Sequence, residues 1–170
     1  VNFLMNLFLK MNHDRMEAVK IAKENNASPN AYIASQLALI GDKPMLSKAR
    51  EHTKFIIDLI REFGINDTTK KIPVEVEKYV KKHLLIKEKQ SENEVEEILF
   101  KEVKKSKKDC LALKVCQHII KIAEKDNLYI KDQYEFLLAA LAVCILWKPM
   151  LEKRISRSVV EDSISYFYII

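Results

Sequence analysis

The chain has 170 residues and a net charge of +5, with 48% hydrophobic and 31% charged residues. This balance excludes a disordered chain, and two glycines and four prolines are too few for the many turns of a sheet protein. The mildly basic charge permits a nucleic acid or an acidic protein as a partner without specifying either. We therefore predict an all-α protein that forms a single helical domain over residues 1–170.

Apolar residues recur at helical spacing along nearly the whole chain. In chain order, the predicted helices cover residues 3–24, 30–40, 45–63, 73–86, a stretch from 91 to a charged junction at 104–109, 110–125, 133–147 and a short last helix. Pro29, Pro44 and Pro73 lie near helix starts, and Gly64 lies just past a helix end, which are the positions that these residues favour. Residues 128–130 form a short extended stretch. The pattern predicts an irregular bundle of about seven helices.

Within this bundle, the helices differ in how apolar they are. Those at 30–40 and 133–147 are apolar on most sides, so we expect them at the centre. Residues 67–109 are richer in charge, and we interpret them as a peripheral two-helix arm between two apolar halves. Three helices have a candidate N-terminal cap followed three residues later by glutamate, the spacing of a capping box. The candidate caps are Ser91, Asp132 and Ser158.

The three cysteines are Cys110, Cys116 and Cys144, an odd number with no spacing typical of a disulfide framework. All three lie in apolar helical patterns, so we expect small, unpaired, buried side chains in a reducing compartment. We therefore predict a cytoplasmic protein. The apolar opening run, residues 1–9, is far shorter than the roughly 20 residues that cross a bilayer, so we expect no contact with a membrane.

No catalytic or metal-binding motif is present in the sequence. The four histidines lie on four different predicted helices, with no second ligand at metal-binding spacing. Two glycines cannot build a loop that cradles phosphates, and no nucleophile motif occurs. The sequence therefore predicts a protein that is not an enzyme and holds neither a metal nor a cofactor.

Lysines are concentrated in the charged stretch and form the candidate nucleic-acid interface. The candidate residues are Lys78, Lys81, Lys82, Lys101, Lys104, Lys105, Lys107 and Lys108. Such lysines can contact phosphates, but nothing in the pattern is suited to reading bases, so any binding is expected to be insensitive to sequence. The alternative is a solvated face in which the interleaved acidic residues pair with the lysines.

Large apolar side chains near the C-terminus form the candidate partner-binding surface. They are Trp147, Tyr166, Phe167 and Tyr168. If these residues do not fold back onto the core, they make an apolar patch for another protein. For Trp147, which lies next to a proline at a helix end, core packing is the alternative.

Three segments of the chain carry a resemblance to a known family. Residues 31–50 contain an apolar helix, a Gly-Asp turn and a basic helix; Gly64, Pro73 and Tyr79-Val80-Lys81 follow in order, and residues 127–133 close the series. In this order the segments resemble the N-terminal helical domain of archaeal DNA primase large subunits. The charged stretch at 87–108 departs from that pattern, and the family's iron–sulfur domain has no counterpart here.

The resemblance implies a role in DNA replication as a non-catalytic regulatory subunit that holds a catalytic subunit and helps it to grip nucleic acid. Two alternatives stay open. Residues 134–148 are similar to the closing helix of some small helical subunits of CRISPR effector complexes, which follow the nucleic-acid backbone. The other alternative is a helical adaptor that binds only protein. In every case the expected partner is a catalytic or effector protein subunit.

Overall fold

The computed structural model describes residues 24, 44–66, 69, 71–90, 94–106 and 110–164. The chain divides into two compact units, and the unit Met45–Ile164 contains nearly all of these residues. The predicted helices at 3–24 and 30–40, including the one expected at the centre, lie outside the described residues. The single domain over residues 1–170 therefore stays a prediction.

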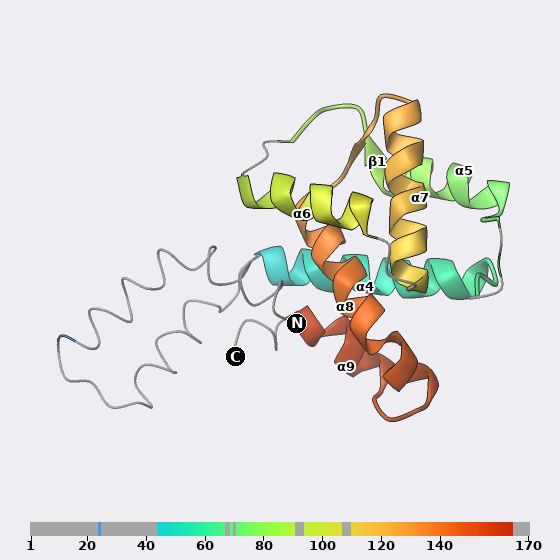
Figure 1. Ribbon diagram of the computed structural model, residues 1–170, viewed down its shortest axis with the longest axis vertical. Helices are drawn as coiled ribbons and strands as arrows, with labels where there is room; N and C mark the ends of the chain where they lie inside the picture. Colours follow the sequence, from blue (N-terminus) through green and yellow to red (C-terminus); the bar gives the residue numbers. More distant parts are fainter. Residues whose placement is uncertain are drawn as a thin grey trace. The chain divides into compact units, whose positions relative to one another are not determined.

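Six helices and two very short strands make up the described part of the chain (Figure 1). They are α4 (Pro44–Glu62), α5 (Val74–His83), β1 (Leu85–Ile86), α6 (Glu94–Lys105), α7 (Leu111–Lys125), β2 (Tyr129–Ile130), α8 (Gln133–Leu151) and α9 (Arg157–Glu161). Of the described residues, 72% are helical and 4% are in strands, which agrees with the predicted all-α class. The number of about seven helices and their arrangement as a bundle stay predictions.

Helix α4 follows from its sequence pattern. Ala49, Ile56 and Ile60 lie at helical spacing and are buried along one side of the helix. The helix ends at Glu62, and Gly64 follows with a φ of 60°, the left-handed conformation that glycine adopts most easily. The Ile65 amide then donates a 2.9 Å hydrogen bond back to the Ile60 carbonyl and closes the end of the helix. The predicted boundaries of this helix are thus correct to within one residue.

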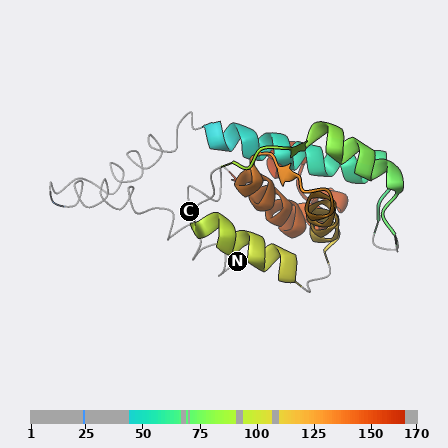
Figure 2. The same ribbon diagram turned by 90° about the horizontal axis from the view of Figure 1, so that it is seen from above.

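Helix α8 is central in the described unit. It packs against α6, α7 and α9, and Figure 2 shows it between α6 on one side and α4 on the other. The ring of Phe136 meets the His52 ring of α4 edge-on, with 5.8 Å between the ring centres. Among the described residues, α8 is also the one helix long and apolar enough to cross a membrane, but half of that window is buried within the protein. Such burial is what a core helix requires.

The two strands join distant parts of the chain in an antiparallel pair. Leu85 pairs with Ile130 and Ile86 with Tyr129, which confirms the extended stretch predicted at 128–130. The helix predicted over 73–86 ends earlier, at His83. It ends there because the chain turns to pair with β2, and the Leu84 carbonyl accepts a 2.9 Å hydrogen bond from the Lys131 amide.

The charged helices α5 and α6 do not form a peripheral arm. Figures 1 and 2 show them in different places, with α5 against α7 and α6 against α8 and α7. Each contributes fully buried side chains to the core: Val76 and Val80 from α5, and Leu99 and Val103 from α6. The prediction of a peripheral two-helix arm is therefore wrong for these helices, because a few apolar residues per helix were enough to bury one face of each.

The predicted caps were only partly correct. Asp132 is the residue before α8, but its φ of 47° is left-handed and its side chain makes no capping hydrogen bond. Helix α9 is capped by Ser156, whose hydroxyl accepts from the Val159 amide, and not by the predicted Ser158. Ser91, the third candidate, lies outside the described residues.

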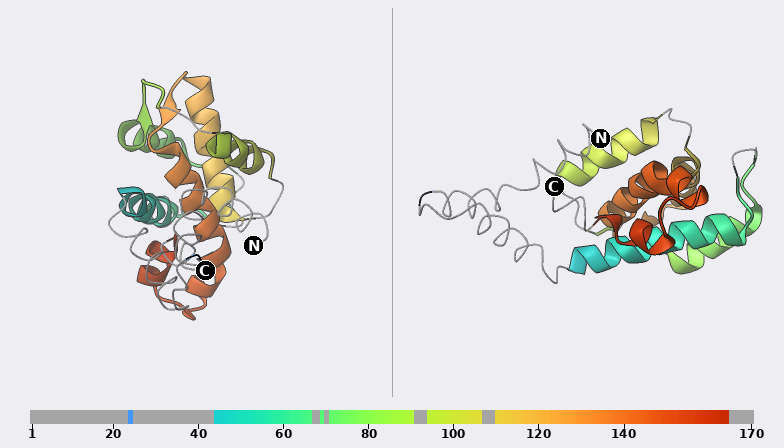
Figure 3. Two further views of the ribbon diagram at one scale, coloured as in Figure 1. Left: turned by 90° about the vertical axis from the view of Figure 1, so that its left-hand side faces the viewer. Right: turned by 90° about the horizontal axis from the view of Figure 1, so that it is seen from below.

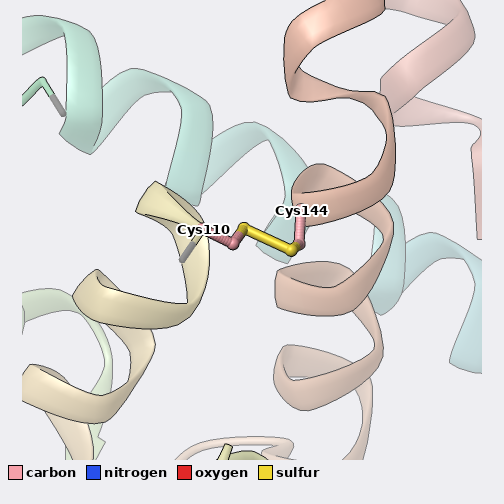
Figure 4. The surroundings of a disulfide bond; sticks show 2 residues. All are labelled: Cys110 and Cys144. Carbon is pink, nitrogen blue, oxygen red and sulfur yellow. A yellow bond between two sulfur atoms is a disulfide. The ribbon is translucent and has the colours of Figure 1, made fainter. Parts of the chain in front are cut away.

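A disulfide connects Cys110, at the start of α7, to Cys144 in α8 (Figure 4). The expectation of unpaired cysteines is therefore wrong for these two. The reason is tertiary: α7 and α8 lie side by side in opposite directions, so residues 34 positions apart in sequence come within 5.7 Å between their Cα atoms. Cys116 is buried and free, as expected, and burial raises the pKa of its thiol.

Candidate functional site

The lysines predicted to bind nucleic acid on α5 fall into two groups. Lys81 is held between two carboxylates, with its Nζ 2.6 Å from Asp126 Oδ2 and 2.7 Å from Glu77 Oε1. Hydrogen bonds to Asp126 and Glu77 raise the pKa of Lys81 and so favour its charged form. The two carboxylates balance that charge. Lys78 and Lys82 are exposed and make no ion pair with any described residue.

The candidate lysines on α6 also divide into those paired with a carboxylate and those that are not. Lys101 Nζ lies 3.3 Å from Glu97 Oε2, one turn earlier on the same helix. Lys104 pairs with Glu124 of α7, and its Nζ also lies 6.0 Å from the centre of the Phe100 ring. Lys105 is exposed and unpaired in the described part of the chain. The remaining two candidates, Lys107 and Lys108, lie outside it.

Three of the six described lysine candidates are therefore paired with carboxylates. This agrees with the alternative interpretation, a solvated face in which opposite charges interleave. Two of the pairing carboxylates are Glu124 in the last turn of α7 and Asp126 directly after it, and no local spacing in the sequence links them to Lys104 and Lys81. Lysines available to phosphates are thus reduced to Lys78, Lys82 and Lys105 within the described residues.

Of the candidate partner-binding residues, the structure describes Trp147, which lies in the C-terminal half of α8, residues 144–151. Ile145 is 41% exposed and Leu151 57% exposed, although both belong to the most apolar helix described. Trp147 is half-buried, so it is neither fully packed in the core nor fully exposed to a partner. Figure 3 (right) shows α9 beside this half of α8, and α9 adds the exposed side chain of Val159. The other predicted residues, Tyr166, Phe167 and Tyr168, lie outside the described residues.

A polar cluster at the start of α8 was missed by the sequence reasoning. Lys48 of α4 donates a 2.5 Å hydrogen bond to Asp132 Oδ1, and His52 Nε2 lies 4.0 Å from Asp132 Oδ2. Burial lowers the pKa of His52 to about 4 despite the nearby carboxylate, so the ring is neutral at pH 7. Burial also raises the pKa of Glu135. No local signal reveals this cluster, because Lys48 and Asp132 are 84 positions apart.

The geometry of this cluster fits a role in stabilising the fold and does not fit a catalytic site. The His52 side chain is only 10% exposed, and its ring packs against Phe136, so a substrate has little access to it. The 4.0 Å separation from Asp132 exceeds hydrogen-bond distance, so the carboxylate does not orient the ring as it would in a catalytic pair. The cluster connects α4 to the start of α8. Among the described residues, no group of three or more His, Cys, Asp or Glu residues could hold a metal ion.

An open cavity of about 400 Å³ lies where α6, the end of α7, β2 and the start of α8 meet. Its apolar lining consists of Phe100, Ile120, Ala123, Leu128 and Ile130. The charged side chains around it are Lys89, Lys101, Glu97 and Glu124, so the charges balance and favour neither an anion nor a cation. The cavity has the size of a small-molecule site, but these residues do not identify a ligand class.

The segments that carry the family resemblance occupy ordinary places in the fold. Gly64 makes the left-handed turn after α4, Pro73 precedes α5, and residues 127–133 include β2 and lead into α8. No protein-family model, curated protein or solved structure matches the chain.

Proposed function

We propose that this protein is a non-catalytic helical subunit of a larger complex and that it binds a partner protein through the C-terminal half of α8. The observation that carries the proposal is the exposure of Ile145 and Leu151 on an otherwise apolar helix. Exposed apolar side chains are typical of protein contact sites. Trp147 and Leu151 are four positions apart and therefore lie on the same side of α8. Trp147, which is half-buried, belongs to the residue type most enriched among energetically important contacts.

The proposed setting is a nucleic-acid-processing complex, most like that of a DNA primase large subunit. This part rests on the resemblance of three sequence segments and on the net charge of +5. Lys78, Lys82 and Lys105 are available for phosphates, so the proposed nucleic-acid contact is weak and independent of base sequence. A catalytic protein subunit supplies the chemistry of the complex.

The pairing of lysines bears on the two alternatives. A CRISPR small subunit depends chiefly on a basic face, and ion pairs occupy Lys81, Lys101 and Lys104. This favours the adaptor that binds only protein as the second candidate, because an adaptor requires the apolar surface and no free basic face. The two candidates share the surface on α8 and differ only in nucleic-acid binding.

The surface is tested with the tagged full chain, by purification of the native complex. Substitution of Ile145→Ser together with Leu151→Ser should abolish co-purification of the partner, because losing central apolar contacts typically costs about 2 kcal/mol or more. The matched control reverses Lys78, Lys82 and Lys105 to glutamate, and it should retain the partner because rim charges contribute under about 1 kcal/mol. Retention by the serine variant with loss by the glutamate variant contradicts the proposed surface.

Nucleic-acid binding separates the primase-like subunit from the adaptor. Titration of a labelled single-stranded oligonucleotide at several salt concentrations should show weak binding that falls steeply as salt rises. The glutamate variant should weaken the binding and flatten its salt dependence, whereas the serine variant should leave both unchanged. An absence of binding even at low salt would select the adaptor.

A further inference from the structure

Cys110 and Cys144, which form the disulfide, are less buried than Cys116, the third cysteine. Both bonded residues are half-buried, whereas Cys116 is fully enclosed. The 5.7 Å between the two Cα atoms lies in the ordinary range for disulfides. The backbone therefore suits a bond between these two residues, and Cys116 is not accessible as a competing thiol.

We propose that Cys110 and Cys144 form a reversible redox switch that exchanges with low-molecular-weight thiols and disulfides, and that Cys110 is the attacking thiol. In the oxidation, the Cys110 thiolate attacks a small-molecule disulfide, forms a mixed disulfide and releases one small thiol. The Cys144 thiolate then attacks the Cys110 sulfur and releases the second small thiol. Two protein thiols and one small disulfide thus become one protein disulfide and two small thiols, and reduction reverses both steps.

Cys110 is the attacking residue because of its place at the start of α7. It is the N-cap of this 15-residue helix, with extended backbone angles of −143° and 124°. Its side chain makes no capping hydrogen bond with the first turn. The positive end of a helix favours a negatively charged group at this position, which here is the thiolate. Cys144 lies inside α8 and has no such environment.

The bond can open without unfolding the protein, because the helices it connects are held by apolar packing. Leu111, Ala112 and Leu113 bury the first turn of α7, and Ala140 and Val143 are buried just before Cys144. Gln117 also holds the end of α6 to α7, by donating hydrogen bonds of 2.9 Å to the Val103 carbonyl and 2.8 Å to the Ser106 carbonyl. Reduction therefore acts locally.

The local effect falls on the C-terminal half of α8, so this part of the inference rests on the proposed function of that surface. Pro149 lies inside α8 and has no amide hydrogen, so the carbonyl of Ile145 loses its helical partner. The disulfide anchors Cys144, the residue just before this weakened segment, to α7. Opening the bond loosens the segment that carries Ile145 and Leu151, and binding to the partner protein weakens.

The switch is tested by equilibrating the full-length protein in buffers with different ratios of reduced to oxidised glutathione. Free thiols are then trapped by alkylation and located by mass spectrometry. The expected result is a single transition from dithiol to Cys110–Cys144 disulfide, identical from both directions, with Cys116 unlabelled until the protein is denatured. A disulfide that resists every ratio, or thiols that stay reduced at every ratio, overturns the proposal. No partner is required, so the outcome is independent of the proposed function.

Two single variants test the role of Cys110. The thiol of Cys110 in Cys144→Ser should react with iodoacetamide roughly tenfold faster than the thiol of Cys144 in Cys110→Ser. Equal rates, or the reverse order, contradict the assignment of the attacking thiol. Cys116→Ala is the matched control and should leave the glutathione transition of the native pair unchanged. If a single variant fails to fold, the rates of the two thiols are compared in the reduced native protein.

Hydrogen exchange tests the local effect. Amides of residues 144–151 should exchange roughly tenfold faster in the reduced than in the oxidised protein, while those of 134–143 should be unchanged. Uniformly faster exchange over all of α8 would show that the disulfide holds the fold as a whole, and would overturn the switch. Loss of partner binding on reduction is measured separately, so a wrong partner surface leaves the redox and exchange results intact.

Discussion

The two halves of α8 share an apolar sequence and differ in what surrounds them. In residues 134–143, nearly every side chain is buried, and Phe136, Leu137 and Ala140 have at most a trace of exposed surface. In residues 144–151, Ile145 and Leu151 are exposed. Helix α4 meets the first half through the His52 and Phe136 rings. The sequence of an apolar helix indicates that its side chains need contacts. It does not indicate which part of the helix the rest of the chain will cover.

This difference supports the assignment of the two halves to separate roles. The first half contributes buried side chains to the core, and the second half is the one proposed to bind a partner. If that division is correct, substitutions in the two halves should have opposite consequences for stability and for binding.

Phe136→Ala should destabilise the protein by about 3–5 kcal/mol, because it removes a fully buried ring and leaves a cavity against His52. Denaturant unfolding followed by circular dichroism measures the change in the free energy of unfolding. Phe136→Leu is the matched control and should cost clearly less, because most of the volume is kept. A loss under about 1 kcal/mol for the alanine variant would mean that the first half of α8 is not the core.

His52, which packs on the first half of α8, should make stability dependent on pH. Its pKa is about 4 in the folded protein and has an ordinary value of 6.5 when unfolded, because burial disfavours the charged ring. The unfolded state therefore binds the proton more readily between these values, so stability is complete above pH 6.5 and falls as the pH drops through 4. The loss from this group amounts to about 3 kcal/mol.

The variant His52→Gln should flatten the decline in stability between pH 6.5 and 4, measured by denaturant unfolding at several pH values. Carboxylate titration contributes to both proteins and cancels in the difference between them. The matched control is His83→Gln, at an exposed histidine, and it should keep the slope of the unmodified protein. Equal slopes for all three proteins would show that His52 is not buried as a neutral ring.

Pro149→Ala should stabilise the second half of α8 by about 1 kcal/mol. The alanine amide can donate a hydrogen bond to the Ile145 carbonyl. The stabilisation from this bond exceeds the cost of the larger conformational entropy that alanine gives the unfolded chain. Hydrogen exchange of residues 144–151 should slow, with no change in the first half of the helix. Destabilisation by the substitution would indicate that this half depends on the backbone conformation set by proline. The two halves would then differ less in stability than proposed.

Ile145→Ser with Leu151→Ser should change stability least, by under about 1 kcal/mol, because both side chains are exposed and neither is a core residue. Thermal unfolding of the double variant measures this. A loss as large as that of Phe136→Ala would show that the second half of α8 belongs to the core, and would remove the basis of the proposed partner surface.

The sequence was sufficient for features that depend on neighbouring residues. The apolar period identified α4, α7 and α8, and the start of α4 near Pro44 and its end near Gly64 follow from the backbone preferences of those residues. The extended stretch at 128–130 was also correct. These signals are local, because a helix is stabilised by bonds and contacts within a few positions of each residue.

The sequence was insufficient where residues far apart meet. Local spacing predicted Asp132 as a cap, but Lys48, 84 positions away, bonds its carboxylate. It also suggested lysines free for phosphates, whereas the end of α7 and the residue after it supply carboxylates to Lys104 and Lys81. In each case the partner comes from an element whose position depends on the packing of the whole unit.

Sequence alone thus determined that this protein is helical and where most of its described helices lie, because hydrogen bonding and apolar spacing within a helix are local properties. Tertiary structure alone decided that Cys110 faces Cys144, that α5 and α6 join the core, and that Ile145 and Leu151 in the second half of α8 are exposed. Those outcomes depend on which apolar faces meet, and many pairings of amphipathic helices satisfy the same sequence pattern.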